Sequence, residues 1–375
     1  MGNAMIDIAI IGAGTAGSFA AQQLTAAGFS CCIVEKSRGR GGRCSRRSIF
    51  GGFNVDLGAA SFPIPYNEHP ALVDQINQWL DAGYLSEWLF EANDFNEQTE
   101  TLKKAEVCGT PSMNAFHRHL TEGIECLTQK RINSLKRVDD YWQLLDQTGD
   151  LIVEAKHVVV TAPAEQAHDL LSPFDLVKEP HLATHETSQY DPILHASQAS
   201  LPQYMCAIAF EHPQPHLADV YTGNHPVFAK AIRANSKPAQ PRPDDGHVAE
   251  VWILHSTYQW AQQQQHQDAE SAAEAMRRQF CEDFNIVEPN TKRLLKSDPA
   301  RVVTSHYWRL SGHDTVAINN YAHQHQAKQT PFLWNEDLKL GCCGDWLAGG
   351  GIAGALSSSQ QLSKHIISST TALEA

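Results

Sequence analysis

Three glycines and one acidic residue near the start of the chain have the spacing of a phosphate-binding turn. Gly12, Gly14 and Gly17 follow an apolar run, and Glu35 ends a second one. The first glycine permits a tight turn, the second lets a diphosphate approach the backbone, and the third allows a helix to pack closely against a strand. The free N–H groups that begin this helix attract phosphates, and the acid accepts hydrogen bonds from ribose hydroxyls. The predicted contacts with a dinucleotide are Gly12, Gly14, Thr15, Ala16, Gly17 and Glu35.

A cationic, glycine-rich stretch follows this acid directly. Residues 36–47 read KSRGRGGRCSRR and hold six cations in a chain whose formal net charge is -13. Because the rest of the chain is acidic, a general affinity for nucleic acid is not expected, although a basic targeting or nucleic-acid patch is the alternative. A glycine-rich stretch with cations suits the diphosphate and flavin end of an extended FAD. We expect Lys36, Gly42 and Arg43 to contact the cofactor, with Arg40 as a further candidate and Arg38, Arg46 and Arg47 in solvent.

A second glycine cluster lies between residues 341 and 354. It has the order strand, loop, helix, which places Asp345 at the carboxyl end of a strand, where doubly wound sheets bind ligands. A helix beginning near Ile352 could aim its N-terminus at the flavin ring and stabilise negative charge there. The alternative for this segment is a simple loop and a C-terminal helix. Trp346 is a candidate neighbour of the flavin or, equally, a core aromatic residue.

The elements that must position these residues can be expected from their periodicity. Apolar runs predict buried parallel strands, helical spacing predicts amphipathic helices, and short alternating runs with turn signals predict a β-meander. These patterns give strands over 6–11 and 31–35, helices over 15–27, 68–88 and 268–284, and a meander over 126–162 that ends in the buried run 157–161. The fold class expected is α/β, with a Rossmann-type dinucleotide-binding domain.

The totals indicate a globular protein of two packed domains. The chain has 375 residues, of which 42% are hydrophobic and 19% charged. It lacks a run of roughly 20 apolar residues and a leader pattern, so we expect no membrane span and a cytoplasmic protein. Its nine cysteines are expected to be reduced core thiols, and its 19 histidines show no metal-ligand spacing, so no metal site is expected.

Several motifs together resemble bacterial renalases, within the wider flavin amine oxidase group. The resemblance spans residues 8–366 and includes two more specific stretches, RANSKP at 233–238 and WILHSTYQW at 252–260. The other motifs are EKSRGRGGR at 35–43, DLGA at 56–59, GTPSM at 109–113, VVVTAP at 158–163 and CGDW at 343–346.

The resemblance implies noncovalent FAD and an amine oxidase-like or p-hydroxybenzoate hydroxylase-like architecture. It implies an FAD-binding domain from residues 1–65, 104–170 and 300–375, and an α+β substrate domain from residues 66–103 and 171–299. The implied reaction is oxidation of dihydronicotinamide isomers by hydride transfer to flavin, with oxygen as acceptor and hydrogen peroxide as product. The implied partner is thus a small molecule, a pyridine nucleotide, with no nucleic acid, membrane or obligate protein partner. The resemblance adds Gly58 and Ala59 to the cofactor contacts.

The substrate residues are less clearly marked. His255 is the candidate polar group of the pocket, and Arg233 and Lys237 are candidates for binding substrate phosphates. A core histidine and solvated loop cations are the alternatives. The chain departs from the family pattern at Ala60-Ser61, at Tyr307 and at 351–353. A flavin amine oxidase or other small-molecule dehydrogenase therefore stays open, as does a nonenzymatic nucleotide-binding sensor.

Overall fold

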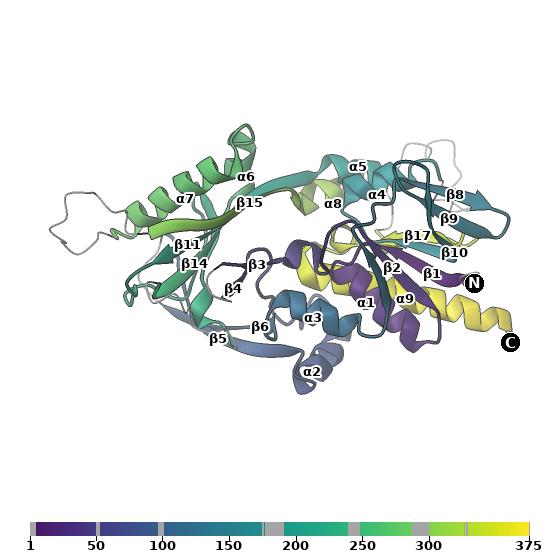
Figure 1. Ribbon diagram of the computed structural model, residues 1–375, viewed down its shortest axis with the longest axis horizontal. Coiled ribbons are helices and arrows are strands. Elements are labelled where there is room, and N and C mark those ends of the chain that lie inside the picture. Colours follow the sequence, from purple (N-terminus) through teal and green to yellow (C-terminus); the bar gives the residue numbers. More distant parts are fainter. Residues whose placement is uncertain are drawn as a thin grey trace.

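A computed structural model describes most of the chain as two sheets with helices packed on them (Figure 1). The residues described are 5–49, 53–96, 101–174, 176, 191–238, 248–286, 300–325, 327 and 329–374. Parts of both predicted domains, among them 177–190, 239–247 and 287–299, lie outside the described residues.

The first sheet is the Rossmann-type sheet that the sequence predicts. Its strand order is β16-β17-β10-β1-β2-β7, with β8 and β9 joined to β10 as a meander. The strands are β1 (Ile6–Ile11), β2 (Cys31–Glu35), β7 (Glu125–Thr128), β8 (Ser134–Val138), β9 (Tyr141–Leu145), β10 (Leu151–Val160), β16 (Phe332–Asn335) and β17 (Leu340–Cys343). The core of this sheet, from β17 to β7, is parallel, which brings the carboxyl ends of β1, β2, β10 and β17 to one edge.

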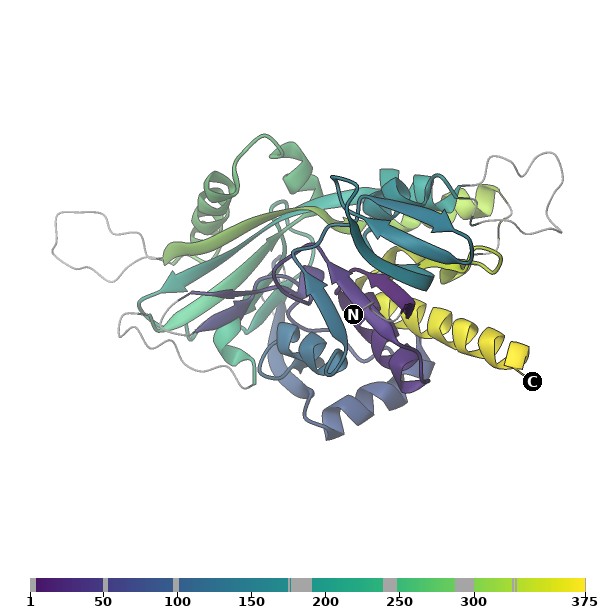
Figure 2. The same ribbon diagram turned by 45° about the vertical axis from the view of Figure 1, so that its right-hand side comes forward.

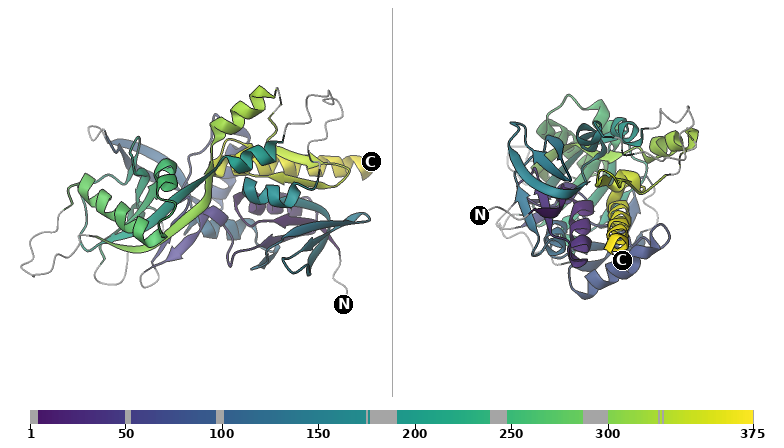
Figure 3. Two further views of the ribbon diagram at one scale, coloured as in Figure 1. Left: turned by 90° about the horizontal axis from the view of Figure 1, so that it is seen from above. Right: turned by 90° about the vertical axis from the view of Figure 1, so that its right-hand side faces the viewer.

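Two helices from opposite ends of the chain cover one face of this sheet. These are α1 (Thr15–Ala26) and α9 (Gly351–Glu374), which pack against each other over the apolar side chains of β1 and β2 (Figure 3). The meander, α4 (Ala164–Leu171) and α5 (Pro192–Gln198) cover the other face. Covering both faces is what a buried parallel sheet requires, and it explains the continuous apolar strands.

The second sheet is mixed and contains seven strands. Its order is β15-β11-β14-β13-β12-β5-β6, antiparallel except where β12 runs parallel to β5. The strands are β5 (Leu85–Asp94), β6 (Leu102–Gly109), β11 (Ser200–Phe210), β12 (Val220–Thr222), β13 (Phe228–Arg233), β14 (Glu250–Ser256) and β15 (Ala300–His313). Helix α7 (Ala269–Asp283) packs on the outer face against β11 and β15, at the side of the molecule opposite the Rossmann sheet in Figure 1.

Two strands lie on the other side of the predicted domain boundaries. The sequence-based division placed 104–170 and 300–375 with the FAD-binding domain, yet β6 pairs with β5 and β15 pairs with β11 in the second sheet. The predicted helix over 68–88 is also wrong in extent. A short 3-10 turn, η2 (Pro70–Leu72), leads into α2 (Val73–Asp81), and the chain turns at Gly83, whose φ of +73° favours glycine, before β5 begins.

The remaining elements are short strands and helices that lie between the larger elements along the chain (Figure 2). They are η1 (Gly42–Cys44), the hairpin strands β3 (Arg46–Ser48) and β4 (Asn54–Asp56), α3 (Met113–Leu120), η4 (Ala234–Ser236), α6 (Tyr258–Gln263), α8 (Thr315–Gln324) and η5 (Asp345–Leu347).

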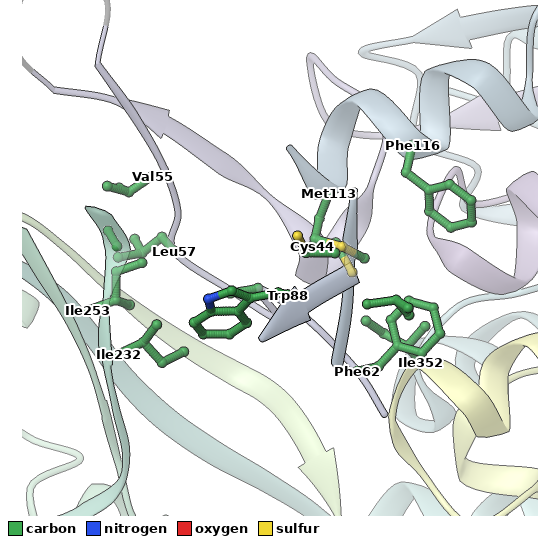
Figure 4. Close-up of a cluster of buried hydrophobic side chains, with 14 of the residues drawn as sticks. Cys44, Val55, Leu57, Phe62, Trp88, Met113, Phe116, Ile232, Ile253 and Ile352 are labelled. Carbon is green, nitrogen blue, oxygen red and sulfur yellow. The ribbon is translucent and has the colours of Figure 1, made fainter. Parts of the chain in front are cut away.

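A single apolar cluster joins the two sheets. In Figure 4, Trp88 and Ile253 of the second sheet lie on one side of this cluster, and Phe116 and Ile352 lie on the other. All four side chains are buried. Because strands of the second sheet and the helices α1 and α9 of the Rossmann layer contribute to one core, their relative placement is fixed by packing.

Candidate active site

A cavity of about 1550 Å³ extends from the carboxyl edge of the Rossmann sheet to the inner face of the second sheet. Of the predicted cofactor contacts, the lining contains Gly12, Gly14, Thr15, Ala16, Glu35, Lys36, Gly42, Arg43, Ala59, Asp345 and Ile352. Residues that are far apart in sequence therefore meet around one space. Gly17, Gly58 and the four candidate substrate residues are treated individually below.

The three glycines of the turn after β1 have the geometry that their roles require. Gly12 has a φ of +113°, and a Cβ there would lie 2.8 Å from Thr161 Oγ1. A Cβ on Gly17 would lie 2.0 Å from the Gly12 carbonyl oxygen, so this residue sets the close approach of helix and strand. A Cβ on Gly14 would meet nothing within 4 Å. The space beside Gly14 thus belongs to the cavity, where a ligand phosphate could approach the backbone.

The N-terminus of α1 is open toward this space. Its N-cap is Gly14, no side chain caps it, and its first turn carries no acidic residue. The free N–H groups and the helix dipole therefore remain available for an anion. The hydroxyl of Thr15 is 3.0 Å from Nε2 of His117, whose Nδ1 is 2.6 Å from the Met113 carbonyl oxygen.

His117 is a supporting residue that the sequence did not reveal. Because a carbonyl only accepts, its Nδ1 must donate, which leaves Nε2 to accept the proton of Thr15. Burial lowers the pKa of His117 to about 4, so the ring is neutral near neutral pH. Thr15 therefore offers a ligand its backbone N–H and a hydroxyl oxygen. No local pattern marks a histidine 102 residues from the turn as its partner.

Glu35 lies at the end of β2, buried and firmly held. One carboxylate oxygen accepts from the Ala13 N–H at 2.8 Å and the other from the Ser37 N–H at 2.7 Å. Each oxygen keeps a further lone pair, and the residue lines the cavity, so ribose hydroxyls could still donate to it. Lys36 turns to Gln166 at 2.8 Å instead, and burial, with nearby Arg131, lowers its pKa.

Arg43 and Asp345 form a two-bond ion pair at the centre of the cavity. The guanidinium donates to the carboxylate at 2.5 and 3.0 Å and to the Ser311 carbonyl oxygen at 2.9 Å. Burial would raise the pKa of Asp345, but the charge and hydrogen bonds of Arg43 outweigh it and lower that pKa below its usual value. The two predicted cofactor contacts are thus brought together, each holding the other in place.

Two further glycines bring the chain close to Arg43. A Cβ on Gly58 would lie 1.9 Å from the Arg43 carbonyl oxygen, to which the Ala59 N–H donates at 3.0 Å. Gly42, with a φ of +53°, lies against Gly14, because its Cβ would be 3.2 Å from the Gly14 Cα. Gly58 therefore allows close packing of the backbone, and Gly42 links the cationic stretch to the phosphate-binding turn.

The start of α9 lies at the same cavity. Gly349, Gly350 and Gly351 all have positive φ and form the turn that leads into Ile352. Ile352 packs against the apolar cluster between the sheets while also lining the cavity. The N-terminus of α9 therefore lies at the cavity, and the sequence correctly predicts a helix that begins near Ile352.

The opposite wall consists of side chains from neighbouring strands of the second sheet. His255 of β14, Met205 of β11 and His306 of β15 are directly paired, so they form one row on the inner face. Gln203 and Trp308 form the next pair along the same face. All five residues line the cavity. This row was not expected from the sequence, except for His255.

The protonation of His255 follows from its partner. Its Nε2 is 3.1 Å from the Leu57 carbonyl oxygen and must donate, so Nδ1 carries a lone pair. Burial, with a contribution from Lys230, lowers its pKa to about 4. The neutral ring can therefore accept a hydrogen bond or a proton at Nδ1.

The other three predicted substrate residues are engaged elsewhere. Lys237 forms a buried ion pair with Asp56 at 2.5 Å, and Arg233 donates to Glu250 at 2.5 Å. Trp346 is buried, with its Nε1 3.3 Å from the Ala162 carbonyl oxygen. None of the three is among the lining residues of the cavity as far as the structure describes them. Their positions fit structural roles, because two of them form interior ion pairs and the third is a core aromatic ring.

The described residues contain neither a metal-binding cluster nor a helix that could span a membrane. Within them, no group of three or more His, Cys, Asp or Glu side chains could hold a metal ion. No helix among the same residues is both long and apolar enough to span a bilayer.

Comparisons with known proteins agree with this geometry. Residues 10–78 match the family model described as an NAD(P)-binding Rossmann-like domain. The chain therefore contains such a domain, and the Rossmann prediction is confirmed.

Two solved structures share the overall fold of this chain. Wild-type putrescine oxidase bound to putrescine has a TM-score of 0.61 and 13% identity, with 97% of this chain and 99% of that chain covered. A candidate protoporphyrinogen oxidase from Exiguobacterium sp. 255-15 has a TM-score of 0.62 and 12% identity, with 98% and 99% covered. At this identity the likeness shows the fold, and the predicted amine oxidase-like architecture is confirmed.

Proposed function

We propose that this protein is an FAD-dependent oxidoreductase that oxidises a small molecule held between the cofactor and the second sheet. The single observation that carries this proposal is the continuous cavity between the glycine turn after β1 and the side-chain row of β11, β14 and β15. FAD, when bound, would accept a hydride from the substrate and pass the electrons to oxygen, giving hydrogen peroxide.

The residues present fit the cofactor. The open space beside Gly14 and the uncapped N-terminus of α1 suit the diphosphate, and Glu35 suits the ribose of the adenosine half. Arg43 would offset phosphate charge, and the N-terminus of α9 at Ile352 would favour negative charge on the ring. The role of these residues is to bind and orient, which is the main requirement of hydride transfer.

The size of the cavity supports two occupants. Its volume of about 1550 Å³ exceeds the roughly 300 to 1,000 Å³ typical of a site for one small ligand. The adenosine and diphosphate contacts all lie on the Rossmann side, which leaves the row of His255, Met205 and His306 for a second molecule.

The charge of the lining favours an anionic or neutral substrate. Its three described acids, Glu35, Asp169 and Asp345, all come from the nucleotide-binding side. The part near the second sheet has Arg46 and Arg47 of β3 instead, and Arg47 is close enough to His306 to lower its pKa, which burial already depresses. A dihydronicotinamide nucleotide carries phosphate that such arginines could bind. We therefore retain oxidation of dihydronicotinamide isomers as the specific substrate proposal.

Amine oxidation is the second candidate. The observation in its favour is the shared fold with putrescine oxidase over 97% of this chain. A hydride can leave only from the neutral amine, and the Nδ1 lone pair of His255 could accept a hydrogen bond from that amine. The cationic lining near His306 opposes a substrate with two positive charges.

One anaerobic experiment separates these readings. The purified protein would be tested for yellow flavin absorbance and then mixed with dihydronicotinamide isomers, with putrescine and with monoamines. Fast bleaching by a dihydronicotinamide isomer supports the leading proposal, and faster bleaching by an amine favours the second. Bound flavin that none of them reduces would instead support a nonenzymatic sensor, and a protein that binds no flavin would overturn the proposed function.

A further inference from the structure

The imidazole of His313 is buried without a hydrogen-bond partner. His313 ends β15 and is 8% exposed, and neither of its ring nitrogens has a partner among the described residues. A buried polar group without a partner costs free energy, so native structures seldom keep one without a reason. Asp345 is close to this ring, because Nδ1 lies 3.9 Å from a carboxylate oxygen of that residue. This distance is too long for a hydrogen bond but short enough for a small movement to close it.

Asp345 has Arg43 as its present partner. The two-bond pair at 2.5 and 3.0 Å neutralises a carboxylate that is itself only 5% exposed. The pair balances one positive and one negative charge, so a neutral His313 is compatible with it. Any anion that draws the guanidinium away would leave the carboxylate buried and unbalanced, which is a large cost.

A diphosphate at the N-terminus of α1 is an anion that could draw the Arg43 guanidinium away from Asp345. Gly42 directly precedes Arg43 and lies against Gly14, the residue beside the open phosphate space. Arg43 is therefore within reach of an anion at the N-terminus of α1. Planar guanidinium groups bind phosphate oxygens through two parallel bonds, so the diphosphate would compete directly with Asp345.

We propose that His313 is a positioning residue that takes up a proton and pairs with Asp345 when a diphosphate engages Arg43, so that cofactor binding strengthens as the pH falls. This inference rests on the proposed cofactor, and it concerns His313, which lies outside every motif quoted above. The proton restores the charge balance that the ligand disturbs.

The groups around His313 set the direction of the effect. Burial lowers the pKa of His313 to about 4, with Asp345 opposing and Arg43 adding to that shift. Tyr258 of α6 lies against the adjacent Gly312, and its raised pKa keeps it neutral. A bound diphosphate adds negative charge and shares Arg43, and both changes raise the pKa of His313. The complex then binds a proton that the free protein lacks, so the gain in affinity is largest below the pKa in the complex and is lost as the pH rises through it.

The test compares cofactor affinity across pH in the wild type and in His313→Gln. Glutamine keeps a polar side chain but cannot titrate. FAD binding would be followed by flavin fluorescence and ADP binding by calorimetry, between about pH 5 and 8, where histidines titrate. The wild-type Kd for both ligands should rise with pH by up to about tenfold per unit, the slope for one linked proton. His313→Gln should give a flat profile, whereas His266→Gln, at an exposed histidine outside the cavity lining, should keep the wild-type slope.

A second measurement tests the proposal in the unmodified protein. The imidazole resonance of His313, assigned by its loss in the variant or by selective labelling, should titrate at a higher pH with ADP than without it. An unchanged titration, or the same slope in the wild type and His313→Gln, would overturn the role of His313 while leaving the cofactor assignment intact. If neither FAD nor ADP binds at any pH, the proposed function falls and this inference falls with it.

Discussion

The two walls of the cavity are built by different means. On the Rossmann side the ligand-facing groups are mostly backbone, at Gly12, Gly14 and the start of α1. On the second-sheet side they are side chains, such as His255 and His306, that strand register brings into one row. A backbone wall recognises what all dinucleotides share, whereas a side-chain wall can change its chemistry one residue at a time. We therefore expect the choice of cofactor to depend on local backbone conformation and the choice of substrate to depend on strand pairing.

The largest expected effect comes from filling the backbone wall. Gly14→Val would place a branched side chain in the space where a diphosphate approaches, and no protein atom lies within 4 Å of its Cβ. We expect flavin binding to be abolished while the fold is kept, measured by flavin content and circular dichroism.

The matched control is Gly17→Val. Its Cβ would lie 2.0 Å from a backbone oxygen, so this variant should lose its fold together with its flavin. If Gly14→Val purifies with a full complement of flavin, the backbone wall does not bind the diphosphate.

A substitution of Lys237 tests whether this buried cation contacts substrate. Its side chain pairs with Asp56 in the interior, so Lys237→Ala would leave a buried carboxylate without its partner. We expect the free energy of unfolding to fall by about 3 to 5 kcal/mol, measured by urea denaturation. Lys230→Ala, which removes a longer and more exposed ion pair with Glu106, should cost less than about 1 kcal/mol. A Lys237→Ala protein of normal stability but raised KM would restore the substrate role.

Glu35 sharpens the comparison on the cofactor side. Glu35→Ala removes a charged acceptor from the ribose and should weaken FAD binding by about 1.5 to 3 kcal/mol, read as a rise in Kd. Glu35→Gln keeps the size of the side chain and an acceptor oxygen, so its loss should be smaller. Equal flavin affinity in the wild type and both variants would contradict a ribose contact.

The smallest expected effect is on the side-chain wall. Arg47→Glu reverses a charge that faces His306, so kcat/KM for an anionic substrate should fall by roughly tenfold, about 1.4 kcal/mol, with flavin content unchanged. Arg278→Glu, on the exposed face of α7, should leave both quantities as they are. A gain in activity toward anionic substrates would reverse our interpretation of this wall.

The sequence predicts the backbone wall well because its signals are local. Each of these signals indicates a backbone conformation or a contact within its own segment. They are the glycines at 12, 14 and 17 and the acid at 35. Helix α7 was also foreseen from its periodicity, with Asp268 as its N-cap. The arrangement of Arg43 against Asp345 could be anticipated only in part, because each was assigned to the cofactor and neither to the other.

The side-chain wall could not be predicted because register is not local. The row of Met205 and His306 depends on the pairing of strands about 100 residues apart, and β15 itself was not recognised as a strand of the second sheet. The sequence did not reveal His117 and His313 for the same reason. Each lies close to a residue that is distant in the sequence, Thr15 and Asp345 respectively. Arg233 and Lys237 lie in interior ion pairs, and charge alone does not distinguish such a pair from a ligand contact in the sequence.

Strand β15 carries His306 toward the proposed substrate and His313 beside Asp345. Both rings line the cavity, and the pairing of β15 with β11 is shifted between them, so their positions depend on this irregularity as well as on the alternation of side chains along the strand. Strand pairing therefore constrains the number of residues between 306 and 313 more tightly than the length of a loop is constrained. Related proteins that keep both histidines should also keep this spacing, even where every residue between them has been exchanged.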